Sequence, residues 1–236
     1  MDIADSRLMT VRGQLRFLSR YFLKPDESLV HGAEIFADFL NDQNFVDEVE
    51  KADREREVFT FEVVEEAVLA RFEEEAMEIM EGYVRLLVFD ALVGNNDHHF
   101  YNWGVITDVR GKRPARFSPV YDTARGLFWN DPDQKLKKVV EDNRVEAFVA
   151  KYTKGSRPKT GWTGSPLNHF DFIAQIESSR SGYRHALRSL DLGSLEEKTQ
   201  ALLQDEFEGL FIPERALLIL ECLRVRRERL ESILGN

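Results

Sequence analysis

Three polar residues in the middle of the chain, Asp97, Asn102 and Asp122, have the types and spacing that phosphoryl transfer needs. Asp97 and Asn102 lie in one polar stretch, residues 94–102, and Asp122 follows a short apolar segment. In kinase-type enzymes one carboxylate faces the acceptor hydroxyl, while an amide oxygen and a second carboxylate hold the nucleotide's Mg²⁺. We therefore expect Asp97 to accept the hydroxyl proton, and Asn102 and Asp122 to bind the metal.

The same polar loop has two other interpretations. Asn and Asp are common in ordinary turns, where their side chains bond to the nearby backbone. The adjacent His98 and His99 also suggest a transition-metal site with Asp97, as in the phosphoesterases named for an Asp-His-His motif. Those enzymes need further motifs, which do not flank the remaining histidines, His31, His169 and His185. We expect instead that His99 packs inside the loop and braces Asp97, while His98 points outward.

The elements around the loop are predicted to position these side chains. Residues 77–93 are apolar nearly all round and predict a buried central helix. Gly94 is expected to end this helix, because glycine readily adopts positive φ. Residues 103–107 and 116–120 predict two short strands around a basic turn at residues 110–112. Asp97 would then follow a helix, and Asp122 would follow a hairpin.

The rest of the chain is predicted to be mainly helical. Residues 1–10 read as a loose lead-in and residues 11–22 as a strand, followed by a turn at residues 24–26. Helical spacing follows over residues 33–49 and 61–72, residues 130–138 read as irregular, and residues 153–166 as a long loop. Asn168, Ser194 and Pro213 are expected to open later helices. Basic residues around the long loop, which either contact phosphate or an acidic substrate or are simply solvated, are Lys151, Lys154, Arg157 and Lys159. Arg125, three residues after Asp122, is the better candidate for contact with the site, with a surface salt bridge as the alternative.

The composition fits a folded chain with one large domain or two small ones. Apolar residues make up 43% of the 236 residues and 17 are Phe, which is enough to fill a core. The net charge of −10 argues against a nucleic-acid groove as the main surface. Cys222 is the only cysteine, so an intrachain disulfide is excluded, and its apolar surroundings predict a buried thiol. No apolar run approaches a membrane span and residues 1–5 lack signal-peptide features, so we expect a soluble cytoplasmic protein.

At its polar loop the chain resembles the C-terminal lobe of HipA-like serine/threonine protein kinases. The catalytic loop of that family reads Gly-Asn-x-Asp-x-His-x-x-Asn, and its fixed positions match Gly94, Asn95, Asp97, His99 and Asn102. The metal-binding motif of the family, Pro-x-Tyr-Asp, matches Pro119, Tyr121 and Asp122. The correspondence covers residues 77–122, and the helices on either side carry no diagnostic motif.

This resemblance implies a predominantly α-helical α+β fold of the protein-kinase type, with a small β hairpin at the site. It implies ATP and Mg²⁺ as cofactors and a Ser or Thr hydroxyl of a protein as acceptor. The implied catalytic residues are Asp97 and His99, and the implied nucleotide-binding residues are Asn102, Asp122, Phe17 and Ser19. A bacterial toxin–antitoxin context is also implied, with a helix-turn-helix antitoxin as partner. Neither membrane binding nor direct nucleic-acid binding is expected.

The sequence departs from the family pattern before the site. A kinase needs an N-terminal lobe with a glycine-rich phosphate loop and a lysine on a strand. The glycines before the site are only Gly13, Gly32 and Gly82, and the first lysine, Lys24, falls at a predicted turn. We interpret residues 1–22 as a remnant of that lobe ending in the hinge strand, and residues 23–236 as the C-terminal lobe. A truncated or split gene, a second chain that supplies the N-terminal lobe, and a protein that binds without catalysing all remain open.

The sequence is therefore consistent with three functions. The first is transfer of the ATP γ-phosphoryl group to a protein Ser or Thr, by a lobe that is incomplete without an N-terminal lobe. The second is a non-catalytic interaction module, which predicts an exposed apolar surface around Leu15, Phe17 and Tyr21. The third is a lipid or small-molecule kinase lobe, because several kinase-like families share the Asp/Asn/Asp arrangement.

Overall fold

The computed structural model describes residues 1–235 and divides into two compact units. The first unit comprises Met1–Leu86, His98–Thr123 and Lys159–Pro166, and the second comprises residues 87–97, 124–158 and 167–235. Helices predominate and the two sheets are small and antiparallel, which confirms the predicted α+β class. In the described part of the chain, no helix is long and apolar enough to cross a membrane.

A three-stranded antiparallel sheet lies in the first unit, with the order β3 (Glu27–His31), β4 (Gly104–Asp108), β5 (Arg116–Phe117). The β4–β5 hairpin confirms the two predicted strands, although β4 begins one residue later than expected and β5 has only two residues. Strand β3 was not predicted, because its pairing with β4 joins segments more than seventy residues apart in the sequence. That pairing sets His31 opposite Gly104, at the end of the polar loop.

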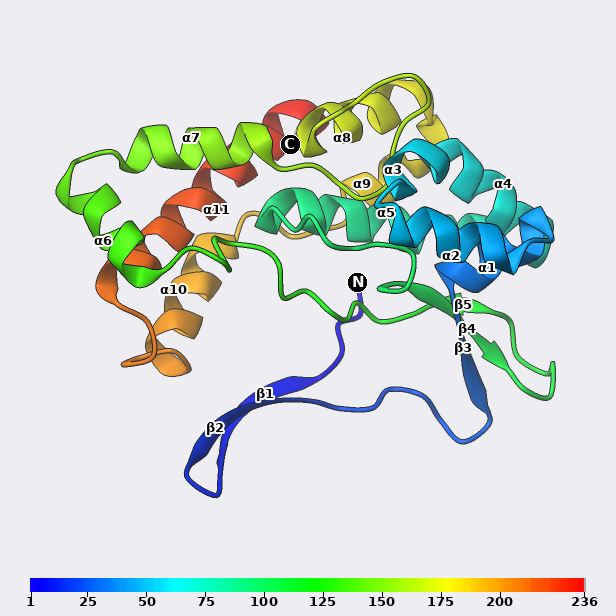
Figure 1. Cartoon of the computed structure of the whole chain (residues 1–236), viewed down its shortest axis with the longest axis horizontal. Coiled ribbons are helices and arrows are strands. Elements are labelled where there is room, and N and C mark those ends of the chain that lie inside the picture. The colour runs from blue at the N-terminus through cyan, green and yellow to red at the C-terminus, as the bar shows by residue number, and fades with distance from the viewer. Residues whose placement is uncertain (236) are drawn as a thin grey trace. The chain divides into compact units, whose positions relative to one another are not determined.

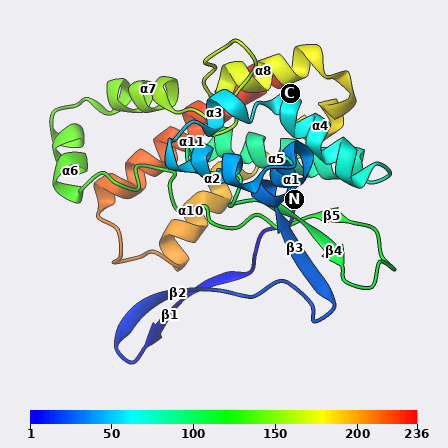
Figure 2. The same cartoon turned by 45° about the vertical axis from the view of Figure 1, so that its right-hand side comes forward.

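A separate hairpin is formed by β1 (Ser6–Val11) and β2 (Gln14–Ser19). Arg12 and Gly13 connect the strands with φ values of 52° and 76°, as a two-residue turn that matches strand twist requires. The predicted lead-in over residues 1–10 is therefore wrong, because most of it forms β1, whereas the strand predicted within residues 11–22 is present as the shorter β2. Figures 1 and 2 show this hairpin apart from β3, β4 and β5 within the unit. Its side chains are mostly exposed on both faces, so no buried face marked the register in the sequence.

The carboxylate of Glu27 ties the ends of the three-stranded sheet together. It lies 3.1 Å from Arg116 Nη1 and 3.4 Å from Arg113 Nη1, and it accepts a 3.0 Å hydrogen bond from the Lys24 backbone N–H. The hydrogen bond from Arg116, followed by that from Lys24, lowers the pKa of Glu27 from 4.5 to about 2. The ionised carboxylate is therefore part of the folded state of the sheet.

Replacing Glu27 with glutamine is expected to lower the free energy of unfolding by about 1–3 kcal/mol at pH 7, the usual range for hydrogen bonds to charged groups. Because folding lowers the pKa, the contribution is present above pH 4.5 and is lost as the pH falls toward 2. Urea unfolding of both proteins at pH 7 and pH 3 is the measurement, and the difference between their free energies of unfolding should be smaller at pH 3. Glu48→Gln, an exposed position on α2 (Gln43–Lys51), is the control. A difference that stays constant with pH would contradict the assignment.

The other helices of the first unit are α1 (Gly32–Leu40), α3 (Glu55–Val58) and α4 (Phe61–Phe72), together with the N-terminal part of α5 (Ala76–Val93). Aromatic rings join these helices to the polar loop. Phe36 of α1 stacks on Phe59 at 4.1 Å between ring centroids, and Phe59 meets Phe100 edge-on at 5.0 Å. The ring centroids of Trp103 and of Tyr83 in α5 lie 4.7 Å apart. Burial of these large rings fixes the backbone on both sides of Asn102.

The second unit is a helical bundle around α11 (Pro213–Leu234), whose neighbours are α6 (Asp133–Glu141), α7 (Val145–Gly155), α8 (His169–Ser179) and α10 (Leu195–Asp205). The short helix α9 (Arg184–Leu187) packs against α8. A 3₁₀ turn covers Ser181–Tyr183. The core cluster against α11 includes Phe128, Leu136, Val139, Val149, Leu218 and Cys222. Burial raises the pKa of the Cys222 thiol to about 11, in keeping with the predicted buried thiol.

The helix starts predicted in this unit are confirmed, and the irregular segment is corrected. Residues 130–138 are not irregular, because Leu136 and Val139 lie one turn apart and bury one face of α6. Helix α10 begins directly after Ser194, as predicted, but the serine side chain does not cap it, since its hydroxyl donates to Asp191 at 2.5 Å instead. Asn168 caps α8 through its side-chain oxygen, and Pro213 occupies the first turn of α11.

Candidate active site

The polar loop begins where α5 ends, at Gly94. This residue has a φ of 69°, as predicted for the end of the helix. The Tyr152 hydroxyl donates to the Gly94 carbonyl at 3.0 Å, and a Cβ on Gly94 would lie 2.6 Å from the Tyr152 ring. Glycine is thus required here both for backbone conformation and for space.

Within the second unit, Asp97 takes part in a short-range hydrogen bond and in an ion pair. Its backbone N–H donates to the Asn95 side-chain oxygen at 3.1 Å, and Asn95 in turn donates to Asp90 Oδ1 at 3.3 Å. Asn95 and Asp90 are both buried. Arg125 Nε lies 3.0 Å from Asp97 Oδ2, so Arg125, the expected contact of the site, pairs with the proposed catalytic acid. The carboxylate of Asp97 is therefore fixed in orientation.

Asn102 lies in the first unit, in a stretch anchored by α1. The N–H groups of Gly32 and Ala33 donate to the carbonyls of Trp103 and Phe100, at 3.2 and 3.0 Å. These bonds satisfy helix-terminal donors that would otherwise lack partners. A Cβ at Gly32 would lie 2.5 Å from the Trp103 ring, so the approach requires glycine. Asn102 itself is buried, and its backbone N–H donates to the His99 carbonyl at 2.8 Å.

Asp122 follows β5 in the first unit and has an unusual backbone. Its φ is 52°, in the left-handed region that few residues other than glycine, Asn and Asp adopt. The residue is exposed, and it has no hydrogen-bond or ion-pair partner in the described chain. The neighbouring Tyr121 hydroxyl donates to the Tyr101 carbonyl at 3.2 Å. Residues adjacent to Asp122 and to Asn102 are thus hydrogen-bonded to each other.

Burial of Tyr121, with a smaller effect from the charge of Asp122, raises the pKa of the tyrosine. The phenol therefore stays protonated at neutral pH and keeps its hydrogen-bond donor. Its oxygen also lies 3.1 Å from His31 Nδ1. This network fixes the segment that carries Asp122 against the segment that carries Asn102.

The expectation for the two histidines is corrected by the structure. His98 does not point outward: it is buried, and its Nε2 lies 3.1 Å from the Tyr121 carbonyl oxygen. His99 is half-buried, and its Nδ1 accepts a 3.3 Å hydrogen bond from the Tyr101 backbone. The turn after His99 draws that ring toward Tyr101, while His98 takes the inward position. Within residues 1–235, no group of three or more His, Cys, Asp and Glu side chains is arranged so that it could hold a metal ion.

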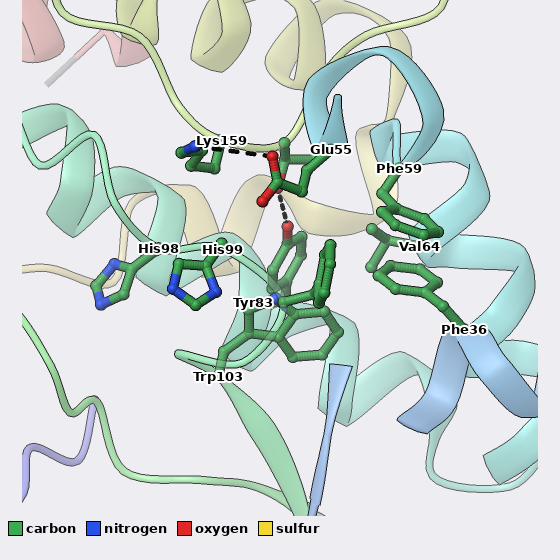
Figure 3. A pocket seen from close by; sticks show the side chains of 11 residues that line it. Phe36, Glu55, Phe59, Val64, Tyr83, His98, His99, Trp103 and Lys159 are labelled. Atoms are coloured by element: carbon green, nitrogen blue, oxygen red, sulfur yellow. Dashed lines mark hydrogen bonds and ion pairs between the residues drawn. The ribbon is translucent and has the colours of Figure 1, made fainter. Parts of the chain in front are cut away.

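A small cavity of about 10 Å³ is lined by His98, His99, Tyr83 and Trp103, among others. Figure 3 shows the rings of Tyr83 and Trp103 on its wall. This volume holds about one water molecule. Lys159 closes one side through ion pairs with Glu55 at 3.7 Å and with Asp53. Lys159, expected to be a candidate for contact with phosphate, thus ties the loop after α7 to α3.

Phe17 and Ser19, the proposed nucleotide contacts of the hinge strand, lie in β2. Ser19 pairs with Ser6, and 69% of Phe17 is exposed. The first unit brings Asn102 and Asp122 onto hydrogen-bonded segments, whereas Asp97 belongs to the second unit. The convergence of all three on one metal–nucleotide site stays a prediction.

The loop geometry, with an acid after a buried helix and another after a hairpin, agrees with a family comparison. The family described as HipA-like C-terminal domain matches residues 2–188. The chain belongs to this family. No curated protein matches the sequence. The crystal structure of the proinflammatory kinase CtkA from Helicobacter pylori is similar, with a TM-score of 0.72 and 14% identity over 99% of this chain and 76% of that one.

At this identity the likeness to CtkA shows the fold alone, and that fold is a kinase-type lobe. Two positioning residues of this HipA-like domain were missing from the sequence predictions. Asp90 is the single acid in the C-terminal half of an otherwise apolar helix, which was a usable signal. Tyr121 matched the family motif but had no assigned role, because its partners lie about twenty or more residues away in the sequence.

Proposed function

We propose that this HipA-like domain is the catalytic lobe of a kinase that transfers the γ-phosphoryl group of ATP to a Ser or Thr hydroxyl of a protein. The observation that supports the proposal is that each unit supplies one of the two acids: Asp97 after α5, held by Arg125, and Asp122 after β5, which has no hydrogen-bond or ion-pair partner among residues 1–235. In this proposal the Asp97, Asn102 and Asp122 side chains converge on one Mg²⁺-nucleotide.

The residues present fit a magnesium ion. Mg²⁺ prefers oxygen ligands and keeps several waters, so one carboxylate and one amide oxygen are enough beside phosphate oxygens. Asp122 offers an exposed carboxylate without a partner in the described chain, on a backbone held in the left-handed region. Strain of this kind, about 1–3 kcal/mol, is found at functional sites. When bound, the metal neutralises the charge that develops on the transferred phosphoryl group.

Asp97 orients the acceptor hydroxyl and takes its proton as the new oxygen–phosphorus bond forms and the bond to ADP breaks. The ion pair with Arg125 holds the carboxylate, and the hydrogen bond from the Asp97 backbone N–H to the Asn95 side chain holds the backbone of the residue, before the substrate arrives. His99, the second proposed catalytic residue, supports the loop through its hydrogen bond with Tyr101. Phe17 and Ser19 would contact the nucleotide base from β2.

The partners of this lobe also belong to the proposal. A glycine-rich phosphate loop is absent from residues 1–96, so we propose that an element outside these 236 residues covers the phosphates, either a further segment of the same protein or a separate chain. Membership of the HipA-like family supports a bacterial, cytoplasmic toxin–antitoxin setting with a helix-turn-helix antitoxin as partner.

One observation favours the interaction module as a second candidate. The predicted apolar surface around Leu15, Phe17 and Tyr21 is exposed, with exposed fractions of 51%, 69% and 78%. An exposed apolar group on a hairpin is suited to a partner protein. A partner bound to this surface would either complete an active kinase lobe or occupy a lobe that binds without catalysing.

Incubation with Mg²⁺ and γ-labelled ATP tests the proposed function. The expected result is transfer of label to Ser or Thr of a protein from a bacterial extract, mapped by mass spectrometry, and no transfer to lipids or sugars. Transfer to lipids or sugars alone would support the small-molecule kinase. The absence of transfer to any acceptor, even with the protein completed by candidate covering chains, would favour the interaction module.

A further inference from the structure

A cavity of about 740 Å³ lies in the second unit, on the face formed by α6 and α7. Its walls come from both helices, from the turn that joins them, and from Asn96 in the polar loop. The lining side chains are of two kinds. The apolar part includes Val139, Phe148 and Tyr152, and the charged rim consists of Asp131, Lys135, Lys138, Arg144 and Lys151.

The rim is basic on a chain that is acidic. Four cationic side chains and one carboxylate line the cavity, whereas the whole chain carries a net charge of −10. Lys135 pairs with Asp131, and Arg144 lies 2.7 Å from Asp142. Lys138 and Lys151 have no ion-pair partner in the part of the chain that the structure describes. Two uncompensated cations therefore face this cavity.

A third cation without a carboxylate partner in the described chain lies next to two residues that line this cavity. Arg226 of α11 is fully buried, donates to the Ala91 carbonyl at 2.8 Å and to the Ser156 hydroxyl at 2.9 Å, and has no carboxylate partner among residues 1–235. Its guanidinium also lies 5.5 Å from the centre of the Tyr152 ring. Ser156 and Tyr152 both line the cavity. Because a buried charge acts through a low dielectric, Arg226 adds to the attraction for an anion bound there.

The cavity is elongated along α7. Its lining positions on that helix, Arg144 at the N-cap and then Ala147, Phe148, Lys151, Tyr152 and Gly155, recur every three or four residues on one face. At a rise of 1.5 Å per residue they extend over roughly 16 Å. An extended peptide of about five residues has this length. A single phosphate or carboxylate would contact only part of the rim.

Asn96 connects this cavity to the proposed chemistry, because it lines the cavity and directly precedes Asp97. We propose that the cavity binds an acidic segment of the protein substrate, with carboxylates on the lysines of the rim and an apolar side chain against Phe148 and Tyr152. This inference rests on the proposed function, which supplies the phosphoryl acceptor. The specificity it predicts is for Ser or Thr next to an acidic stretch that contains an aromatic or aliphatic residue.

The test is direct binding of a short fluorescein-labelled peptide in which glutamates alternate with phenylalanine, followed by fluorescence anisotropy. The double variant Lys138→Glu/Lys151→Glu is expected to weaken binding at least about tenfold, since both reversed charges would repel the peptide. The matched control is Lys137→Glu/Lys154→Glu, which makes the same change of net charge on the same two helices outside the cavity. We expect less than about a threefold effect from the control.

Two comparison peptides test the chemistry of recognition. Glutamine in place of glutamate, and alanine in place of phenylalanine, should each weaken binding to the wild-type chain. Equal loss in the cavity and control variants would overturn the proposal, because it would show only a general charge effect. Tighter binding of a single-stranded oligonucleotide, with the same dependence on Lys138 and Lys151, would also overturn it.

The binding assay needs neither ATP nor catalysis, so it separates this inference from the proposed function. Asp97→Asn should bind the peptide as wild type does even if it cannot transfer phosphate. Peptide binding without any phosphoryl transfer would support the proposed peptide site and contradict the proposed kinase activity. Phosphoryl transfer that is equally fast for acidic and neutral peptides, without measurable peptide binding, would support the kinase activity and contradict the proposed peptide site.

Discussion

Replacing Asp97 with asparagine is expected to lower the rate of phosphoryl transfer by roughly 10²–10⁴-fold, the range that a positioned general base contributes. Asparagine keeps the size and the hydrogen-bonding shape of the side chain but cannot take the hydroxyl proton. The measurement is the initial rate of label transfer from ATP to the substrate protein at saturating nucleotide. A decrease of less than about threefold would show that Asp97 is not the base.

The stability of the Asp97→Asn variant separates chemistry from folding. The substitution weakens an ion pair with Arg125, whose side chain is 51% exposed, so the loss of unfolding free energy should be about 0–1 kcal/mol. Thermal unfolding followed by circular dichroism would measure it. Asp205→Asn, at the exposed end of α10, removes the same charge without changing the site and should leave the rate unchanged. A variant that loses several kcal/mol would show that Asp97 has a mainly structural role.

Replacing Asp122 with asparagine is expected to lower the affinity for ATP at least about tenfold in the presence of Mg²⁺, and to have little effect without the metal. Loss of even an outer-shell partner of a metal ligand costs about 10–100-fold, so loss of the carboxylate ligand should cost no less. Asparagine also tolerates the φ of 52° at this position, so the backbone should be preserved. Isothermal titration calorimetry with and without Mg²⁺ measures both affinities.

The two variants together assign different roles to the two acids. Asp97→Asn should bind Mg²⁺-ATP as wild type does and fail in transfer, whereas Asp122→Asn should fail at the binding step. Loss of metal-dependent binding in both variants to the same extent would show that they act as one unit, and the separate roles would be wrong. Wild-type protein that binds no nucleotide even with a covering chain present would contradict the metal site at Asp122.

The sequence by itself determined the local features of this protein. Apolar residues repeat throughout the central helix, and Gly94 supplies the positive φ that ends it. The Asn168 cap and the hairpin around Gly111 also follow from residues that lie a few positions apart. Spacing alone identified Asp97, Asn102 and Asp122, because their roles follow from residue type and from the elements that they follow. The roles themselves stay predictions.

Only the tertiary structure decided which side chains brace these residues. Strand β3 forms because it pairs with β4, and helix α6 because Leu136 and Val139 find a core to fill, so neither was evident from local pattern. His98 turns inward because the Tyr121 carbonyl lies within hydrogen-bond distance, and that partner is 23 residues away in the sequence. The basic cavity likewise joins Asn96 to two helices that begin more than thirty residues later. Long-range packing and hydrogen bonding have no local sequence signature, and they are what positions the side chains of this site.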